Sequence, residues 1–139
     1  MGAINSAAYL ATVRSKMDAQ QQVVAFLESE LQRSILGDTS STVSSISKNM
    51  AGGKIYNIYE KAGLIDDGGD GPGSDWLDAI NDGNEGFAAT ATADQDYLRQ
   101  MLYQARALLG ELRIEEQAWN GEVNTEKALR KEVNDFAKV

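Results

Sequence analysis

Both ends of the chain carry a mostly apolar series of residues at alternating steps of three and four. The N-terminal series is Leu10, Val13, Met17, Gln20, Val24, Leu27, Leu31 and Ser34, and the C-terminal series is Leu98, Leu102, Ala105, Leu109, Leu112, Glu116, Trp119 and Val123. Because an α-helix turns once in 3.6 residues, this spacing places each series along one helix face that a facing helix can cover. The sequence therefore predicts two long helices that pair along these faces.

The N-terminal helix is expected over about 6–36, with Asn5 or Ser6 as its N-cap. Val23 and Phe26 form a second apolar row beside the first series, and Ile35 is a third candidate for this row. Two adjacent rows indicate either a helix contacted from two sides or one broad face that points into a single core.

The C-terminal helix is expected over about 94–137, and Asp94 suits its N-cap. Gly121 lies far inside this segment and predicts a break or kink. Asn124 or Thr125 would then cap a final short helix.

Short helices and loops are predicted between the two terminal helices. In chain order they are a helix from near Thr39 or Ser40 to Gly52-Gly53, a helix or strand over 54–62, a loop over 63–74 and a helix over 75–81. The loop holds five glycines, three aspartates and the only proline of the chain, a composition typical of turns. We therefore expect one all-α domain over 1–139. Its long terminal helices form an antiparallel hairpin or coiled coil, and a central acidic, glycine-rich insert spans about 60–93.

The negative charge of the chain is concentrated in this insert. Between Glu60 and Asp96 lie ten carboxylates and one base, so the segment carries a net charge of -9, whereas the rest of the chain sums to +1. The terminal helices can therefore approach other helices without long-range repulsion, and the insert is expected to face water. Without a basic face, nucleic acid is not expected as a partner.

The residue types exclude several kinds of chemistry. The chain has no histidine and no cysteine, which removes disulfides, thiol nucleophiles and imidazole acid–base catalysis. Adjacent carboxylates such as Glu115 and Glu116 point to different sides of a helix and do not form a catalytic pair. We therefore expect neither an enzyme nor a cofactor. No run approaches the ~20 apolar residues that span a bilayer.

The acidic loop invites comparison with a calcium-binding EF-hand, which needs oxygen ligands at positions 1, 3 and 5 and a glutamate at position 12. A register that begins at Asp66 places Gly68 at position 3 and Leu77 at position 12, and one that begins at Asp78 places Ala89 at position 12. Both registers lack the defining ligand, so a solvated acidic turn is the preferred interpretation. Weak calcium binding by the loop is left open.

Three arginines of the C-terminal helix, Arg99, Arg106 and Arg113, repeat every seven residues beside the apolar series, and Lys127 keeps the register. Flanking charges of this kind select partners in coiled coils. One interpretation is a solvated face with local pairs such as Arg106 with Glu111. The other pairs the arginines with acids of a neighbouring subunit.

Two further features of this helix have alternative interpretations. Gly110 costs about 1 kcal/mol relative to alanine inside a helix, and a close approach of another helix would explain its presence. Trp119-Asn120-Gly121 matches the W-x-G turn of small secreted helical hairpins. Trp119 is more simply explained as a core residue of the apolar series.

Neutral, heptad-bearing ends around a glycine-rich acidic middle, with no Cys or His, resemble the needle and filament subunits of bacterial type III secretion systems, and more distantly flagellin. The resemblance covers residues 10–31 and 98–123, with residues 63–86 as the exposed insert. It implies that the terminal helices form a coiled coil and stack into a filament around a channel. It also implies an extracellular or cell-surface location, reached by export without a cleaved signal, with a secretion chaperone as a possible partner; otherwise the protein is cytoplasmic.

The sequence thus favours a non-enzymatic structural subunit, a homo-oligomer that assembles through its terminal helices. The assembly interface is predicted to comprise Leu10, Val13, Met17, Val24, Leu27, Leu31, Leu98, Leu102, Leu109, Leu112 and Trp119. Alternatives are a soluble helical adaptor or chaperone that binds a partner helix, and a structural protein of a phage virion.

Overall fold

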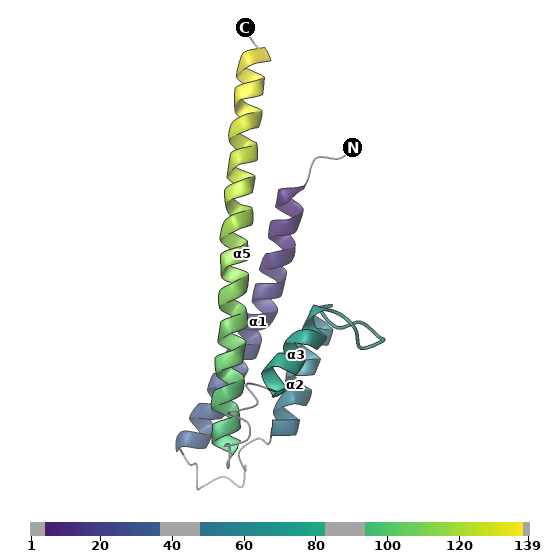
Figure 1. Cartoon of the computed structure of the whole chain (residues 1–139), viewed down its shortest axis with the longest axis vertical. Coiled ribbons are helices and arrows are strands. Elements are labelled where there is room, and N and C mark those ends of the chain that lie inside the picture. Colours follow the sequence, from purple (N-terminus) through teal and green to yellow (C-terminus); the bar gives the residue numbers. More distant parts are fainter. Residues whose placement is uncertain (1–4, 37–47, 83–93, 138–139) are drawn as a thin grey trace.

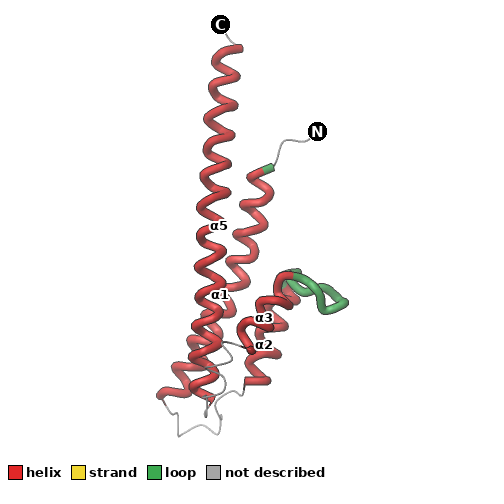
Figure 2. Tube along the Cα trace, in the orientation of Figure 1, coloured by secondary structure: helices red, strands yellow, loops and turns green. Residues whose placement is uncertain are grey.

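The chain is all-α, as the sequence predicts. The computed structural model describes residues 5–36, 48–82 and 94–137. These residues form four helices, which are α1 (Ser6–Leu36), α2 (Lys48–Lys61), α3 (Pro72–Asp82) and α5 (Asp94–Ala137), and they contain no strand (Figure 2). The bounds of α1 and α5 agree with the predicted terminal helices.

α1 and α5 run antiparallel and pack against each other as a hairpin (Figure 1). α2 and α3 pack together and against the hairpin at the end where α1 finishes and α5 begins. We call this part of the molecule, residues 16–36, 48–82 and 94–115, the base. At the opposite end, α5 extends well beyond the first turn of α1 (Figure 1).

α1 begins where a side chain caps its first turn. The Asn5 side-chain oxygen accepts a hydrogen bond from the backbone N–H of Ala8 at 3.2 Å, so Asn5 is the N-cap. Val23 is fully buried and Phe26 is half-buried, whereas Ile35 is 55% exposed and does not extend the buried row. α1 contacts both α5 and α2, and the second apolar row therefore belongs to a helix that is contacted from two sides.

The predicted break in the last helix is wrong. α5 continues through Gly121 for 44 residues, a length of roughly 66 Å at 1.5 Å per residue. Thr125 caps no new helix, because its hydroxyl donates a hydrogen bond to the Gly121 carbonyl at 3.0 Å within α5. One glycine costs about 1 kcal/mol, which is too little to stop a helix that good helix formers extend on both sides.

Gly52 and Gly53 were also expected to end a helix, and they lie inside α2 instead. A Cβ added at Gly52 would lie 3.0 Å from the side-chain oxygen of Asn81 in α3, so this glycine allows α2 and α3 to approach closely. The segment over 54–62 is helical rather than extended, as far as Lys61. The predicted helix start near Thr39 or Ser40 lies outside the described residues.

The loop between α2 and α3 is confirmed, although α3 begins at Pro72, earlier than predicted. Proline suits the first turn of a helix, where its missing N–H has no helical partner. Gly71 has a φ of 136°, and a Cβ at this position would lie 2.3 Å from the Leu64 carbonyl oxygen. That carbonyl accepts a hydrogen bond from Gly73 N–H at 2.9 Å, which closes the loop onto the start of α3.

The hydrophobic core lies mainly in the base, where residues of all four helices meet. The α2 residues Ala51, Ile55 and Tyr59 are four residues apart and fully buried. The rings of Tyr59 and of Trp76 from α3 pack in a T-shaped arrangement, with ring centroids 5.7 Å apart. α2 and α3 therefore cover one side of the hairpin only along the base.

Candidate functional site

The eleven residues predicted to form the assembly interface lie in the hairpin of a single chain. Nine are buried, namely Leu10, Val13, Met17, Val24, Leu27, Leu98, Leu102, Leu109 and Leu112. Leu31 and Trp119 are half-buried and pack against the same core. Because α1 and α5 already cover these side chains, their role between subunits stays a prediction.

Gln20, one of the two polar members of the N-terminal series, is fully buried in the base and joins three helices. Its side-chain N–H donates to the Ala105 carbonyl of α5 at 2.9 Å, and its side-chain oxygen accepts the hydroxyl proton of Tyr59 in α2. Burial raises the pKa of the Tyr59 phenol well above its ordinary value of 10, so the hydroxyl stays protonated as a donor. A shift of one helix along another would leave these groups unpaired.

Two ion pairs cross the hairpin on its surface. The Arg106 guanidinium lies 3.0 Å from the Glu28 carboxylate, and Arg14 Nε lies 3.4 Å from Glu116 Oε2. Arg106 therefore pairs with α1 rather than with Glu111, the local partner considered from the sequence. Exposed pairs of this kind contribute about 0–1 kcal/mol to stability.

Near the N-terminal end of α1, fewer side chains hold the two helices together. The rings of Tyr9 and Trp119 stack with centroids 4.7 Å apart, and the Ser6 hydroxyl donates to the Glu126 carboxylate at 2.5 Å. The helix is continuous at Trp119, so no W-x-G turn is present there. Toward the C-terminus of α5, these are the last ring contact and the last hydrogen bond between α1 and α5 in the described part of the chain.

Beyond Glu126, the last eleven described residues of α5 have exposed side chains. We call residues 127–137 the projecting end. Its large apolar residues Leu129, Val133 and Phe136 are 55%, 66% and 85% exposed. Their spacing of four and three places them on one side of the helix. Sequence reasoning missed this set, although the same i, i+4, i+7 spacing was available to identify it.

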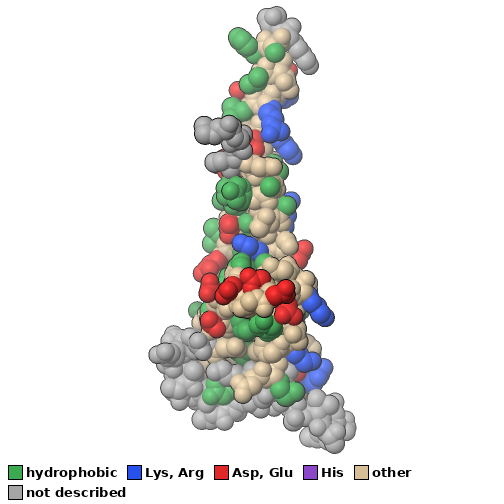
Figure 3. All heavy atoms as spheres, turned by 90° about the vertical axis from the view of Figure 1, so that its right-hand side faces the viewer, with side chains coloured by type: hydrophobic (Ala, Val, Ile, Leu, Met, Phe, Trp, Pro, Cys, Tyr) green, Lys and Arg blue, Asp and Glu red, His purple; other side chains and the backbone are tan. Residues whose placement is uncertain are grey.

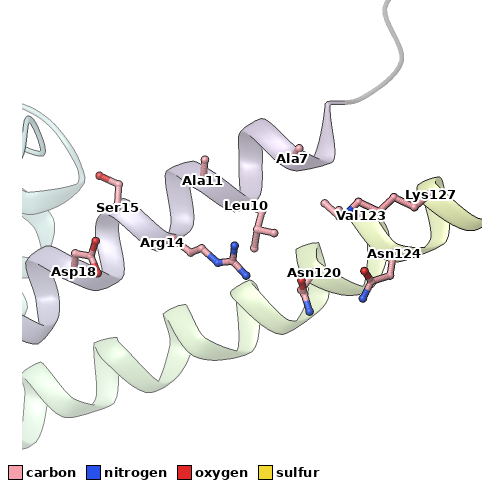
Figure 4. Close-up of a pocket in the computed structure, with 10 residues that line it drawn as sticks. All are labelled: Ala7, Leu10, Ala11, Arg14, Ser15, Asp18, Asn120, Val123, Asn124 and Lys127. Carbon is pink, nitrogen blue, oxygen red and sulfur yellow. The ribbon is translucent and has the colours of Figure 1, made fainter.

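A groove of about 530 Å³ lies between residues 7–18 of α1 and residues 120–127 of α5. Leu10 and Arg14 point from α1 toward α5, and Val123 points back toward α1 (Figure 4). Small side chains, among them Ala7 and Ala11, line the α1 side of the groove. With its mixture of small, apolar and charged residues, the groove fits a peptide backbone or helix better than a compact apolar ligand.

Acidic side chains lie across the middle of one face of the molecule (Figure 3), and the loop between α2 and α3, together with α3, contains six aspartates and no glutamate. The Asp66 carboxylate accepts hydrogen bonds from the N–H groups of Gly68 and Asp70, both at 2.9 Å. Asp66 therefore organises the loop. In the parts of the chain that the structure describes, no group of three or more acidic side chains could hold a metal ion.

Comparisons with known proteins found no matching family, no matching curated protein and no matching solved structure. Among the described helices, none is both long and apolar enough to cross a bilayer. The function is therefore inferred from the geometry of the chain itself, in which the projecting end and the outer surface of α5 remain exposed.

Proposed function

We propose that this protein is a non-enzymatic structural subunit that self-assembles through its terminal helices into a helical filament or a similar oligomer, with the acidic insert exposed. The observation that supports the proposal is the projecting end of α5. This helical segment presents Leu129, Val133 and Phe136 to solvent and has no neighbouring helix in the described part of the chain.

Burial supplies the driving force for assembly. Covering a fully exposed Leu, Val or Phe side chain contributes roughly 1.5–3 kcal/mol. The projecting end continues a helix that is already formed in the base, so little further ordering is needed when a neighbour binds it. A second subunit could therefore bind to it at a low entropic cost.

The shape of the molecule favours an open assembly. The projecting end and the base lie at opposite ends of a long hairpin (Figure 1), so a contact between the two in successive copies joins different surfaces. Heterologous contacts of this kind form rings or helical filaments rather than closed pairs. Lys127, Arg130 and Lys131 lie in the projecting end, and the exposed loop of the base contains Asp66 and Asp67, which would attract each other across such a contact.

The resemblance in layout to type III needle and filament subunits extends this proposal to location. Export without a cleaved signal would place the assembled subunits outside the cell or on its surface, and a secretion chaperone would hold the chain before export. A phage virion protein would use the same assembly physics.

The proposal is tested with the double variant Leu129→Ser/Phe136→Ser, with Ala128→Ser/Asn134→Ser as the matched control at exposed positions of the same segment. The wild-type chain is expected to grow in mass with concentration in light scattering and to form filaments or discrete oligomers in electron micrographs. The first variant should stay monomeric with an unchanged melting temperature, and the control should assemble. A wild-type chain that remains monomeric at high concentration contradicts the proposal.

The groove between α1 and α5 favours a second candidate function, a soluble adaptor that binds a partner helix. Ala7, Ala11 and Ser15 line it at steps of four residues along α1, so a second helix can approach closely there. An adaptor would remain a monomer or compact dimer and would be stabilised by its client. Replacement of Ala11 by arginine should abolish client binding and leave self-assembly unchanged.

A further inference from the structure

α5 has a second regular face besides the one that packs against α1. Tyr103, Ala107, Gly110, Ile114, Gln117 and Gly121 alternate at steps of four and three, and we call them the outer face. At 100° per residue, Ile114 lies about 140° around the helix from the buried Leu109. None of the six is charged, and the five charged residues between Tyr103 and Gly121 all lie at other positions.

Five of the six residues of the outer face are exposed in the single chain, and Gly110 is half-buried. Tyr103 is 70% exposed and Ile114 is 69% exposed. A Cβ added at Gly110 or at Gly121 would meet no atom within 4 Å, so packing inside the chain requires neither glycine. Each costs the helix about 1 kcal/mol relative to alanine. Small residues on an exposed helix face permit another helix to approach closely.

The two edges of the outer face carry different charges. Arg99, Arg106 and Arg113 lie along one edge, and the other edge contains Glu111 between two uncharged positions, Gln104 and Ala118. In a parallel helix pair in register, each residue on the arginine edge of one helix faces a residue on the Glu111 edge of the partner helix. The facing residue lies five positions later in the sequence. In an antiparallel pair, like edges face each other instead.

Charge therefore distinguishes the two directions of pairing. A parallel pair places Arg106 of each copy beside Glu111 of the other, which gives two favourable contacts by symmetry. An antiparallel pair brings together the arginine edges of both copies, and like charges repel. Arg106 already contacts Glu28 of its own chain, but this pair is solvent-exposed, and a guanidinium has five N–H donors to share.

The length of the face is compatible with a weak specific interface. Leu129 and Phe136 lie within about 60° of Ile114 around the helix, so the face continues into the projecting end for about 50 Å in all. A contact strip about 10 Å wide would cover on the order of 500 Å² per copy, or about 1,000 Å² in total. This area is at the lower limit for a stable interface, so pairing should depend on concentration.

We propose that the outer face of α5 binds a second copy of this chain, with the two α5 helices parallel and in register. The inference rests on the proposed self-assembly and specifies a lateral contact along α5, which shares Leu129 and Phe136 with the contact between the projecting end and the base. A parallel pair would carry two projecting ends side by side at the same end of the dimer.

Single cysteines test the direction of pairing, because the natural chain has none. Tyr103→Cys and Gln117→Cys are oxidised separately and as a mixture, and Glu115→Cys serves as a control away from the outer face. In a parallel pair, each of the two face variants should form disulfide-linked dimers with itself about tenfold faster than the control, because pairing raises the local thiol concentration. In an antiparallel pair, cross-linking should instead be efficient in the mixture.

Exchange of charges tests the proposed contact between Arg106 and Glu111. Arg106→Glu and Glu111→Arg should each raise the dimer dissociation constant roughly tenfold, and the double exchange should restore it. Glu28→Gln removes the partner of Arg106 within the chain and should leave the dissociation constant unchanged. Circular dichroism of each variant separates an effect on folding from an effect on pairing.

The outcomes separate this inference from the proposed function. An oligomer whose face variants cross-link no faster than Glu115→Cys, or cross-link only in the mixture, overturns the parallel pairing alone. Failure of the double exchange to restore pairing also overturns it. A wild-type chain that stays monomeric in light scattering overturns both proposals.

Discussion

The two ends of α5 have very different surroundings. At the base, Leu98 is 1% exposed and lies among residues of four helices, whereas Phe136 in the projecting end is 85% exposed. Between them, near Trp119, α5 is accompanied by α1 alone among the described helices, and a groove of small, apolar and charged side chains lies between the two helices. One continuous helix thus passes from a full core through a two-helix region to an unpaired segment.

This difference separates what folds the chain from what could join chains together. Side chains in the base lose nearly all contact with water and therefore supply most of the hydrophobic stabilisation. The projecting end buries none of its large side chains within the chain, so it adds little to the stability of the monomer. Variants in the two regions should consequently affect different measurements, unfolding for the base and association for the projecting end.

The largest effect is expected for Leu27→Ala in the base. Leu27 is fully buried, and removal of a leucine side chain from a core costs about 2–5 kcal/mol through lost transfer energy and the cavity left behind. The melting temperature, followed by circular dichroism, should fall by roughly 10 °C. Leu129→Ala is the matched change in the projecting end. It should lower the melting temperature by no more than about 1–2 °C, which is close to the measurement error. Equal losses at both positions would contradict the division between base and projecting end.

A smaller loss is expected for Tyr59→Phe. Without the phenol hydroxyl, the Gln20 side-chain oxygen remains buried without its donor, which costs about 1–3 kcal/mol. Urea unfolding should show this loss as a lower midpoint with an unchanged slope. Tyr103→Phe is the same change at an exposed position of α5, and it should leave the midpoint unchanged.

The same tyrosine gives the base a characteristic pH dependence. Burial raises the pKa of Tyr59 in the folded chain above its ordinary value of 10, so the unfolded chain releases the phenol proton first as the pH rises. The stabilisation is fully present below pH 10 and decreases above it, toward the raised pKa of the folded state. Tyr59→Phe should therefore lose less stability than the wild type between about pH 10 and 12. Parallel curves for the two proteins would exclude Tyr59 as the cause.

The hairpin could be predicted from sequence because its signal is regular and long. Leu98, Leu102 and Leu109 repeat at helical spacing, and each is buried in the structure. Single glycines predicted the helix ends less well. Gly52 was expected to end a helix, yet it lies inside α2, where its missing side chain leaves room for Asn81 of α3. That close approach depends on tertiary packing, which the neighbouring residues do not encode.

The candidate surfaces were harder to predict for a different reason. An apolar series on a helix predicts that the series is covered, but it does not indicate whether the covering helix belongs to the same chain. Leu27 and Leu109 are covered within the chain. Val133 has the same helical spacing relative to its neighbours. The first residue of α1, Ser6, lies beside Glu126 of α5, so α1 does not extend as far as Val133. Which apolar series remains exposed depends on the lengths of α1 and α5 and on their register. The register is set by packing in the base.

The outer face of α5 should respond in the opposite direction from the base. Gly121→Ala places a methyl group on an exposed part of α5 where it meets no atom within 4 Å. The change should stabilise the monomer by up to about 1 kcal/mol, because alanine loses less backbone freedom than glycine in a helix. Thermal unfolding at low protein concentration measures this gain. A loss of stability there would show that the glycine is needed for folding of the single chain.

The smallest effect on unfolding is expected at the projecting end itself, in Val133→Asn. Val133 is 66% exposed, and exposed substitutions usually change stability by less than about 0.5 kcal/mol. Association should nevertheless weaken, because the apolar stripe between Leu129 and Phe136 would be interrupted by a side chain that requires hydration. Sedimentation velocity over a range of concentrations measures the association, and urea unfolding of dilute protein measures the stability. If unfolding changed and association did not, the projecting end would be part of the fold of the single chain, and its apolar residues would no longer support assembly.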